Sequence, residues 1–163
     1  MRALLKKIKE KRSIKNFSIF VAESCTGGML SNALTSVSGS SEFFKGGIIA
    51  YSNILKIDLL GVPKSKILKY GAVSHQTAEA MVKGLGKISK SEVLVSITGV
   101  AGPKGGSKKT PVGCVFFGVG TKIKKKYKYK TIRKQFKSKT RRKLQEESTS
   151  YALKLINTEI TKI

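Results

Sequence analysis

Hydrophobic and polar residues follow one another along this chain in blocks that predict strands and helices in turn. Short apolar runs rich in β-branched and aromatic residues predict buried strands at 18–22, 46–52, 92–98 and 112–120. Apolar residues at helical spacing predict helices at 3–15, 29–37 and 53–60, after the cap Ser74, and from about 138 to 160. Asn53 is the predicted cap of the third of these helices.

Two segments show a less simple pattern. In 123–133, Tyr127, Tyr129 and Thr131 share one side and lysines dominate the other, which predicts a half-exposed strand whose lysines protect a sheet edge from aggregation. The inward face predicted for the last helix consists of Leu144, Ser148, Tyr151, Leu155 and Thr158.

Together these elements predict an α/β fold, a three-layer α/β/α sandwich with a mixed sheet and helices on both faces. The 163 residues suit a single domain over 1–163, which buries roughly 70% of the surface of its unfolded chain. Its core is therefore large enough to hold a rigid site.

The few cysteines and the single histidine limit the chemistry. Two cysteines, Cys25 and Cys114, make no disulfide framework, so we expect a reduced, cytoplasmic protein. One histidine, His75, excludes a multi-histidine metal site, and no metal or cofactor is expected. No apolar run approaches the roughly 20 residues that span a bilayer. The basic N-terminus also lacks the apolar stretch of a secretory signal, so no membrane partner is expected.

Charge is the most unusual property of the composition. The formal net charge is +24, of which 1–15 carries +6, 16–120 carries +6 and 121–163 carries +12. Clustered lysines attract phosphate, so one interpretation is non-specific nucleic-acid binding. The other is a lysine-biased surface, which the excess of lysine over arginine and the absence of tryptophan favour. Under both interpretations the charge favours anionic ligands.

Three loops follow predicted strands, at 24–28, 51–56 and 99–113. We expect them to meet, because ligand sites in open α/β sheets lie beyond the carboxyl ends of the strands. The third loop is rich in glycine but matches neither a Walker A loop nor a GxGxxG dinucleotide motif. It is either an anion-binding loop or a surface connection.

Ser24 lies in the first of these loops, at a strand-to-helix junction. It is either a nucleophile beside free helix amides that hold a phosphate or an oxyanion, or a helix cap, a role that Thr26 also fits. Gly27 and Gly28 allow a ligand to approach the backbone. Cys25 is a weaker candidate nucleophile, since a buried cysteine more often packs as a small apolar residue.

A nucleophilic serine needs a base. His75 offers an imidazole, but no sequence feature places it beside Ser24. A lysine with a lowered pKa is the other option, and Lys56 fits best, because it lies near a helix start and its neighbours Ile54, Leu55 and Ile57 predict apolar surroundings. Composition alone does not distinguish Lys56 from the other lysines.

Short motifs recur through almost the whole chain. They are AESCTGG at 22–28, GSS at 39–41, YSN at 51–53 with Lys56, LGV at 60–62, GAVS at 71–74, ITGVAGP at 97–103, GGS at 105–107 and PVG at 111–113. In this order and spacing, over about residues 3–160, they resemble the CinA C-terminal domain family in its stand-alone form. The separation of 32 residues between Ser24 and Lys56 fits the family as well.

The resemblance implies hydrolysis of nicotinamide mononucleotide to nicotinate mononucleotide and ammonia by a Ser/Lys amidohydrolase of three-layer α/β/α fold. Ser24 is then the nucleophile, Lys56 the general base and Arg141 a ligand of the substrate phosphate. The other implied substrate-binding residues are Thr26, Gly27, Gly28, Tyr51, Asn53, Thr98, Gly99, Gly102, Gly106 and Ser107. The expected partners are a small nucleotide substrate and further copies of the chain, in a dimer or higher homo-oligomer.

The chain departs from the family pattern near the expected phosphate site. Thr110 stands where the family usually has a lysine, Lys139 and Thr140 replace a glycine and an aspartate, and Gln145 replaces a second arginine. The lysines at 108–109 are candidates to restore the phosphate contacts. An alternative prediction is therefore a catalytically weak or inactive relative that binds nucleotides or nucleic acid through its basic surface.

Overall fold

The computed structural model describes residues 1–138 and 140–163, so Lys139 lies outside the described residues. The strands are β1 Ile19–Glu23, β2 Phe44–Ile49, β3 Val93–Gly99, β4 Cys114–Ile123 and β5 Lys126–Gln135. The helices are α1 Arg2–Ile14, α2 Met29–Thr35, α3 Asn53–Asp58, α4 Lys64–Tyr70, α5 His75–Ile88 and α6 Arg141–Ile160, with a 3-10 turn at Ser40–Glu42. The strands form one sheet of order β2-β1-β3-β4-β5. It is mixed, because β1, β2 and β3 are parallel while β4 runs antiparallel to β3 and β5.

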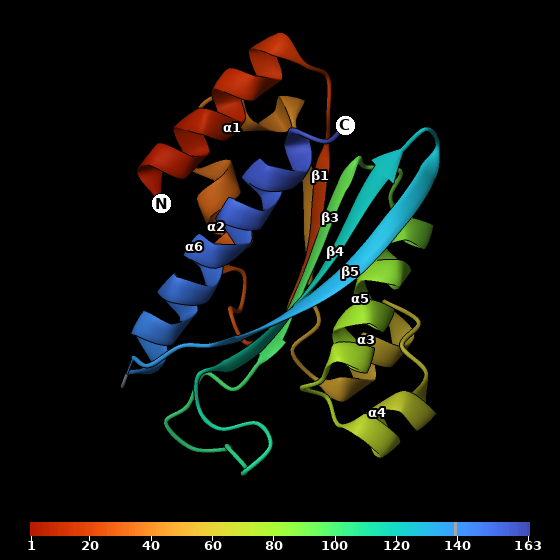
Figure 1. Cartoon of the computed structure of the whole chain (residues 1–163), viewed down its shortest axis with the longest axis vertical. Coiled ribbons are helices and arrows are strands. Elements are labelled where there is room, and N and C mark those ends of the chain that lie inside the picture. Colours follow the sequence, from red (N-terminus) through yellow and green to blue (C-terminus); the bar gives the residue numbers. More distant parts are fainter. Residues whose placement is uncertain (139) are drawn as a thin grey trace.

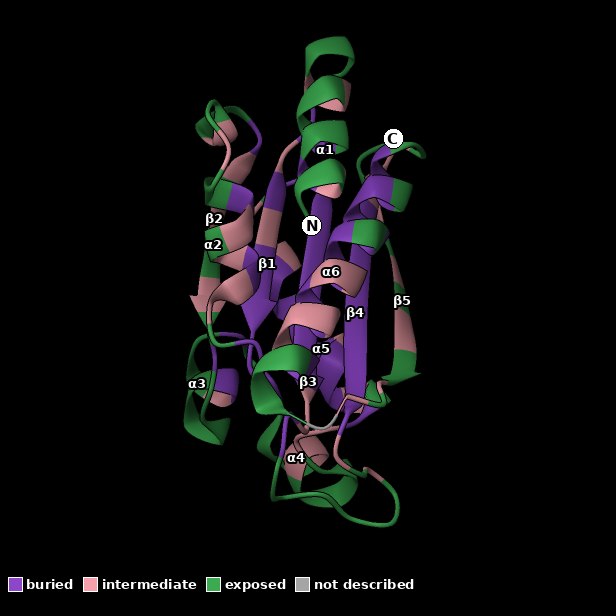
Figure 2. Cartoon of the chain, turned by 90° about the vertical axis from the view of Figure 1, so that its left-hand side faces the viewer, coloured by how far each residue is buried: buried purple, intermediate pink, exposed green. Residues whose placement is uncertain are grey.

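Helices cover both faces of this sheet, which confirms the predicted three-layer α/β/α sandwich (Figure 1). α1, α2 and α6 pack on one face, over Val21, Val95 and Phe117. α3, α4 and α5 lie on the other face, where Leu85 and Leu94 belong to a second core. Buried residues run along the central strands, and α1 carries exposed ones (Figure 2). The alternation of side chains along each strand supplies apolar groups to both cores.

Strand direction brings the three loops to one end of the sheet. β1, β2 and β3 are parallel, so the segments that follow them leave from the same end. α6 begins near this end as well, since the Arg141 side chain donates a hydrogen bond to the carbonyl of Gly102, at 2.9 Å. The predicted meeting of these loops is therefore confirmed.

Some predicted boundaries are wrong. The strand predicted at 123–133 begins too early, because Ile123 is the last residue of β4 and pairs with Lys126. Lys124 and Lys125 form the turn between β4 and β5, with φ of 47° and 69°. α4 was not predicted, because none of its seven residues is buried and no apolar stripe marks it.

The inward face predicted for the last helix is only partly correct. Leu144, Ser148 and Leu155 are buried and Tyr151 is half-buried, but Thr158 is exposed. α6 packs against α1 and α2 as well as against β3 and β4, so its buried face is wider than one stripe. Although α6 has 20 residues, no helix in 1–138 or 140–163 is long and apolar enough to cross a membrane.

Gly84 allows α5 to approach the segment after α3. A Cβ atom at this position would lie 1.9 Å from the carbonyl oxygen of Leu60, so no larger residue fits without a shift of the backbone. This close contact holds the end of α3 against α5. It therefore helps to fix the position of Lys56, which α3 carries.

Candidate functional site

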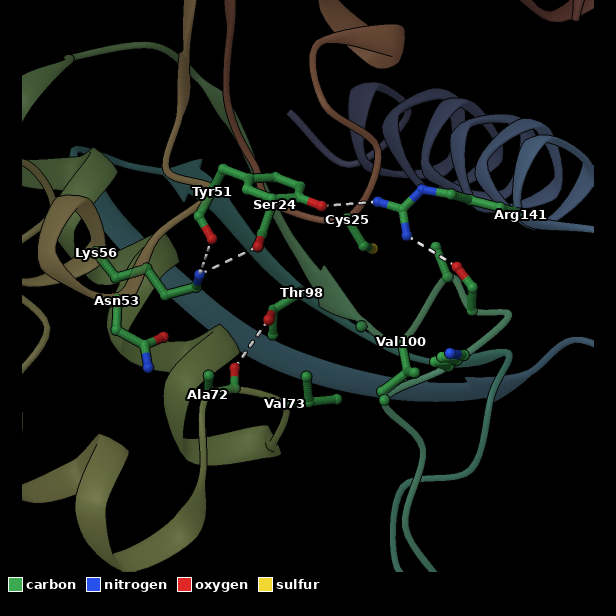
Figure 3. Close-up of a pocket in the computed structure, with 15 residues that line it drawn as sticks. Ser24, Cys25, Tyr51, Asn53, Lys56, Ala72, Val73, Thr98, Val100 and Arg141 are labelled. Carbon is green, nitrogen blue, oxygen red and sulfur yellow. Dashed lines mark hydrogen bonds between the residues drawn. The ribbon is translucent and has the colours of Figure 1, made fainter.

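The loops at the end of the sheet enclose a pocket of about 280 Å³ (Figure 3). Its lining comes from the turn after β1, the start of α3, the segment before α5, the loop after β3 and the start of α6. The lining residues are Ser24, Cys25, Tyr51, Asn53, Lys56, Ala72, Val73, Thr98, Gly99, Val100, Ala101, Gly102, Lys104, Gly105 and Arg141. Lys56, Lys104 and Arg141 are basic and none of these lining residues is acidic, so the pocket suits an anionic ligand.

Ser24 and Lys56 meet in this pocket (Figure 3). The Lys56 amine nitrogen Nζ lies 3.1 Å from the Ser24 hydroxyl oxygen Oγ, and 3.0 and 3.2 Å from the main-chain carbonyl oxygens of Ala50 and Tyr51. The Lys56 residue is only 2 % exposed. Burial disfavours a charged amine, and this desolvation lowers the pKa of Lys56 below its usual 10.5.

The geometry of α3 brings Lys56 into the pocket. Ser52 caps this helix, since its Oγ accepts a hydrogen bond from the Leu55 amide at 3.2 Å, so the prediction of Asn53 as the cap is wrong. Ile54 and Leu55 are 67 % and 37 % exposed. The predicted burial of Lys56 is confirmed, but Ile54 and Leu55 do not provide it, and Ile57 is half-buried. The helix turns Lys56 inward, toward the surrounding loops, while the two apolar side chains face outward.

A buried carboxylate whose role was not predicted holds the turn between Ser24 and α2. Glu23 is fully buried at the end of β1. It accepts hydrogen bonds from the amides of Gly28, Leu30 and Ser31 at 3.1, 3.0 and 2.8 Å, and from the Ser31 hydroxyl at 2.7 Å. These amides at the start of α2 are therefore occupied, and the expectation that they are free for a phosphate is wrong. An acidic residue shortly before a helix is the sequence signal for such a contact.

Glu23→Gln is expected to destabilise the protein by about 2–4 kcal/mol. Each carboxylate oxygen of Glu23 faces two donors. In either orientation of a glutamine side chain, its NH2 group therefore faces two hydrogen-bond donors that have lost their acceptor. Urea unfolding measures the free energy of unfolding.

The control for this prediction is Glu79→Gln. It removes a carboxylate that pairs with Lys83 on the surface of α5 and is expected to cost less than about 1 kcal/mol. An equal decrease of the free energy of unfolding in both variants would contradict a special role for the buried carboxylate of Glu23.

Cys25 follows Ser24 in the pocket but has an unreactive thiol. Burial raises its pKa to about 12, and the thiolate, which is the nucleophilic form, is therefore scarce. Within the described residues, the main-chain amides of Cys25 and Thr26 donate no hydrogen bond to another residue. The N–H groups of Cys25 and Thr26, next to Ser24, therefore have no acceptor among the other described residues.

Arg141 connects two sides of the pocket (Figure 3). Its Nη1 donates to the carbonyl of Gly102 at 2.9 Å, and its Nη2 donates to the hydroxyl of Tyr51 at 2.7 Å. Both acceptors are neutral, and no described carboxylate lies within ion-pair distance of Arg141. The guanidinium is therefore oriented but keeps its charge for a ligand.

The structure brings several of the other expected substrate-binding residues into the pocket. They are Tyr51, Asn53, Thr98, Gly99 and Gly102. The Thr98 hydroxyl also donates to the carbonyl of Ala72 at 2.8 Å, which joins β3 to the segment before α5. Ala72, Val73 and Lys104 line the pocket although no role was predicted for them. The GAVS motif and the glycine-rich loop, which contain these three residues, were the available signals.

Other expected residues lie outside this lining. Residues 26–28 border a separate cavity of about 300 Å³ beside α2. Gly27 and Gly28 have φ of +59° and +95°, so they serve the turn itself, because L side chains rarely adopt this conformation. Gly106 and Ser107 do not line the pocket, and Ser107 instead closes a local turn, its amide donating to the carbonyl of Thr110 at 3.0 Å.

His75, the alternative base, does not line the pocket. Its Nδ1 lies 2.8 Å from the hydroxyl of Thr131 on β5, and its ring packs edge-on against Phe116 with centroids 4.7 Å apart. The structure thus pairs Ser24 with Lys56 and leaves the imidazole elsewhere.

Two of the positions that depart from the family pattern, Thr140 and Gln145, have structural roles here. Thr140 caps α6 through a 3.3 Å hydrogen bond from the Lys143 amide. Gln145 donates to the main-chain carbonyl of Cys25 at 2.9 Å. The lysines at 108–109, the expected substitutes for lost phosphate contacts, do not line the pocket, whereas Lys104 does.

Comparisons with known proteins agree with this architecture. The chain matches the family model of the CinA C-terminal domain over residues 1–160. A CinA-like protein of Thermotoga neapolitana is 50% identical over 99 residues, which is 61% of this chain and 24% of that protein. The chain therefore spans about a quarter of the length of the curated relatives it matches.

Solved structures resemble this chain over nearly their whole length. The competence/damage inducible protein CihA from Agrobacterium tumefaciens superposes with a TM-score of 0.88 at 32% identity, over 94% of this chain and 92% of that one. The competence damage-inducible protein A from Klebsiella pneumoniae gives a TM-score of 0.89 at 24% identity, over 98% and 96%. At 24% identity, the similarity to the Klebsiella pneumoniae structure shows the fold alone.

Proposed function

The chain belongs to the CinA C-terminal domain family, and on that premise we propose that it is an amidohydrolase that converts nicotinamide mononucleotide to nicotinate mononucleotide and ammonia. Ser24 is the nucleophile and Lys56 its base. The contact of 3.1 Å between Ser24 Oγ and Lys56 Nζ carries this proposal, since the lysine is 2 % exposed. An exposed lysine stays charged at neutral pH, so burial is what makes the amine a base.

The three contacts of Lys56 Nζ suit a neutral amine, which has two hydrogens and one lone pair. Its two hydrogens can be donated to the carbonyls of Ala50 and Tyr51, so that the lone pair accepts the Ser24 hydroxyl. Lys56 then takes the serine proton as Oγ attacks the carboxamide carbon. Attack forms a tetrahedral oxyanion, whose donors in this proposal are the main-chain amides of Cys25 and Thr26.

The rest of the cycle returns every proton. Lys56, now an ammonium, protonates the carboxamide nitrogen, which leaves as ammonia while an acyl ester remains on Ser24. Water attacks this ester, and Lys56 again takes the proton. As the second intermediate collapses, the Lys56 ammonium gives this proton to Ser24 Oγ, which releases the nicotinate product and restores both the serine hydroxyl and the neutral amine. One water is consumed for each ammonia released.

The substrate phosphate is held by Arg141 in this proposal. Its two acceptors are neutral, so a phosphate dianion is the stronger partner for the guanidinium. Lys104 lines the same pocket and adds positive charge. The occupied amides at the start of α2 support this placement, because Glu23 already uses them.

Arg141→Ala is expected to raise KM for nicotinamide mononucleotide about 10- to 100-fold and to change kcat much less. A charged hydrogen bond contributes on the order of 1.5–3 kcal/mol, and a contact made equally in ground and transition states appears in KM. Steady-state kinetics of ammonia release separates the two constants.

Arg142→Ala is the matched control, since Arg142 is the adjacent arginine and pairs with Glu146 outside the pocket lining. Its KM should stay near that of the wild type. A collapse of kcat with unchanged KM in Arg141→Ala would instead assign Arg141 to the chemical step.

The function itself is tested with the purified protein and three substrates. Ammonia release from nicotinamide mononucleotide should greatly exceed release from nicotinamide riboside and from free nicotinamide, because neither carries the phosphate. Chromatography should show nicotinate mononucleotide as the second product. Release from none of the three would refute the proposal and favour an inactive relative that only binds nucleotides. Homo-oligomer formation stays a prediction, which light scattering of the same sample tests.

A further inference from the structure

Nearly half of the basic residues of this chain lie in a stretch without any acid. Residues 93–145 contain 16 of the 33 lysines and arginines and none of the nine aspartates and glutamates. Elsewhere along the chain, basic and acidic residues are mixed, as in 16–92, which has eight basic and five acidic residues. A general lysine bias does not remove acids from one stretch, so this distribution points to a particular surface.

The acid-free stretch builds one edge of the sheet. It comprises β3, β4, the edge strand β5 and the first turn of α6. The opposite edge is formed by β2, and the segment 38–63 around it holds two basic and two acidic residues. One of those two basic residues is the buried Lys56. The sheet therefore has one neutral edge, at β2, and one strongly basic edge, at β5.

Exposed lysines from the β4–β5 turn to just beyond the end of β5 form what we call the basic edge. Its members are Lys124, Lys125, Lys126, Lys128, Lys134 and Lys137. None of the six lies within ion-pair distance of a described carboxylate, whereas Lys130 on the same strand pairs with Glu159 and is not included. The charge of the basic edge is therefore not neutralised within the described chain.

The basic edge has the length and chemistry to follow a phosphate backbone. β5 has ten residues, which at roughly 3.3 Å each span about 33 Å, close to one turn of duplex DNA. Lys126 and Lys128 project to the same side of the strand, since side chains alternate. Tyr127 and Tyr129 stack on each other and pack beneath α5, so they are not free to stack on bases. This combination favours contact with phosphates over reading of bases.

We propose that the basic edge binds the phosphate backbone of double-stranded nucleic acid without sequence preference. An anionic membrane fits less well, because no large apolar side chain is exposed among the described residues of 93–145 to insert into lipid. The proposal is independent of the deamidation proposed above, since none of the six lysines lines the pocket.

The test compares two variants of equal net charge by fluorescence anisotropy with a labelled 20-base-pair duplex. One variant carries Lys124→Gln, Lys126→Gln and Lys128→Gln on the basic edge. The control carries Lys64→Gln, Lys69→Gln and Lys87→Gln, three exposed lysines of α4 and α5 that also lack a described ion pair. Binding is measured from about 50 to 200 mM salt, the range in which phosphate contacts lose affinity. Thermal unfolding and ammonia release check that both variants remain folded.

The wild type should bind the duplex at low salt and lose affinity steeply as salt rises. The basic-edge variant should bind at least about tenfold more weakly, and its log–log salt slope should be shallower by roughly 0.9 for each lost contact. The control variant should bind the duplex with nearly the same affinity and salt slope as the wild type. Equal weakening of both variants, no binding by the wild type, or a sequence-preferring complex that survives about 200 mM salt would each overturn the proposal. Binding to vesicles of anionic phospholipid in place of the duplex would overturn it in favour of a membrane.

Discussion

Replacing Ser24 with alanine is expected to lower kcat/KM for deamidation by at least about 10⁴-fold. The variant lacks the oxygen that forms the acyl ester in the proposed mechanism. Lys56 keeps its hydrogen bonds to the carbonyls of Ala50 and Tyr51, so the pocket should keep its shape. Ammonia release measures the loss of activity, and calorimetric titration with nicotinamide mononucleotide should show a nearly unchanged Kd.

Cys25→Ala is the matched control for this experiment, because the thiol lies next to Ser24 and is also buried. A thiol whose pKa is about 12 supplies almost no thiolate, so its loss should leave kcat nearly unchanged. An active Ser24→Ala enzyme together with an inactive Cys25→Ala enzyme would reverse the assignment.

The second large effect is expected at Lys56, through the pH dependence of activity. Burial lowers the pKa of this lysine below 10.5, and only the neutral amine accepts the proton of Ser24. kcat/KM should therefore rise as pH increases through that lowered pKa and level off above it. A pH–rate profile from about pH 6 to 10 measures this ionisation. An activity that falls as pH rises over this range would contradict the assignment of Lys56 as the base.

Two substitutions separate a base from a mere positive charge at this position. Lys56→Arg should lower kcat at least about 10³-fold, because arginine stays protonated at any working pH. Lys56→Met should be equally inactive while it keeps most of the buried volume. If Lys56→Arg fails to fold, Lys56→Met still tests whether activity needs the amine. An active Lys56→Arg enzyme would show that the lysine supplies charge alone.

Lys56 should also shape the pH dependence of stability. With the folded-state pKa below the unfolded value, the unfolded chain binds more protons between the two values. The free energy of unfolding of the wild type should therefore rise with pH in that window, relative to Lys56→Met. Urea unfolding at several pH values measures the difference.

Much of this architecture follows from local pattern. The order of strands and helices was predicted correctly except for α4, because each packed element repeats its apolar residues at its own period. α4 has no buried residue and so no such repeat. Ser24 was placed at a strand-to-helix junction because the apolar run of β1 ends just before it and helical spacing begins at Met29.

The amino-acid pattern alone is thus enough to predict the three layers, the loops that meet at the end of the parallel strands, and the motifs that identify the family. The period of each element left open which lysine is buried against Ser24. The family resemblance pointed to Lys56, and the packed fold shows the 3.1 Å contact and shows that Glu23 rather than a ligand uses the amides at the start of α2. The physical reason is that desolvation and hydrogen bonding depend on every atom packed around a group. Lys56 contacts Ser24, which is 32 residues away in the sequence, while its apolar neighbours Ile54 and Leu55 are exposed. A sequence pattern records only the period of one element, and not what the rest of the chain packs against it.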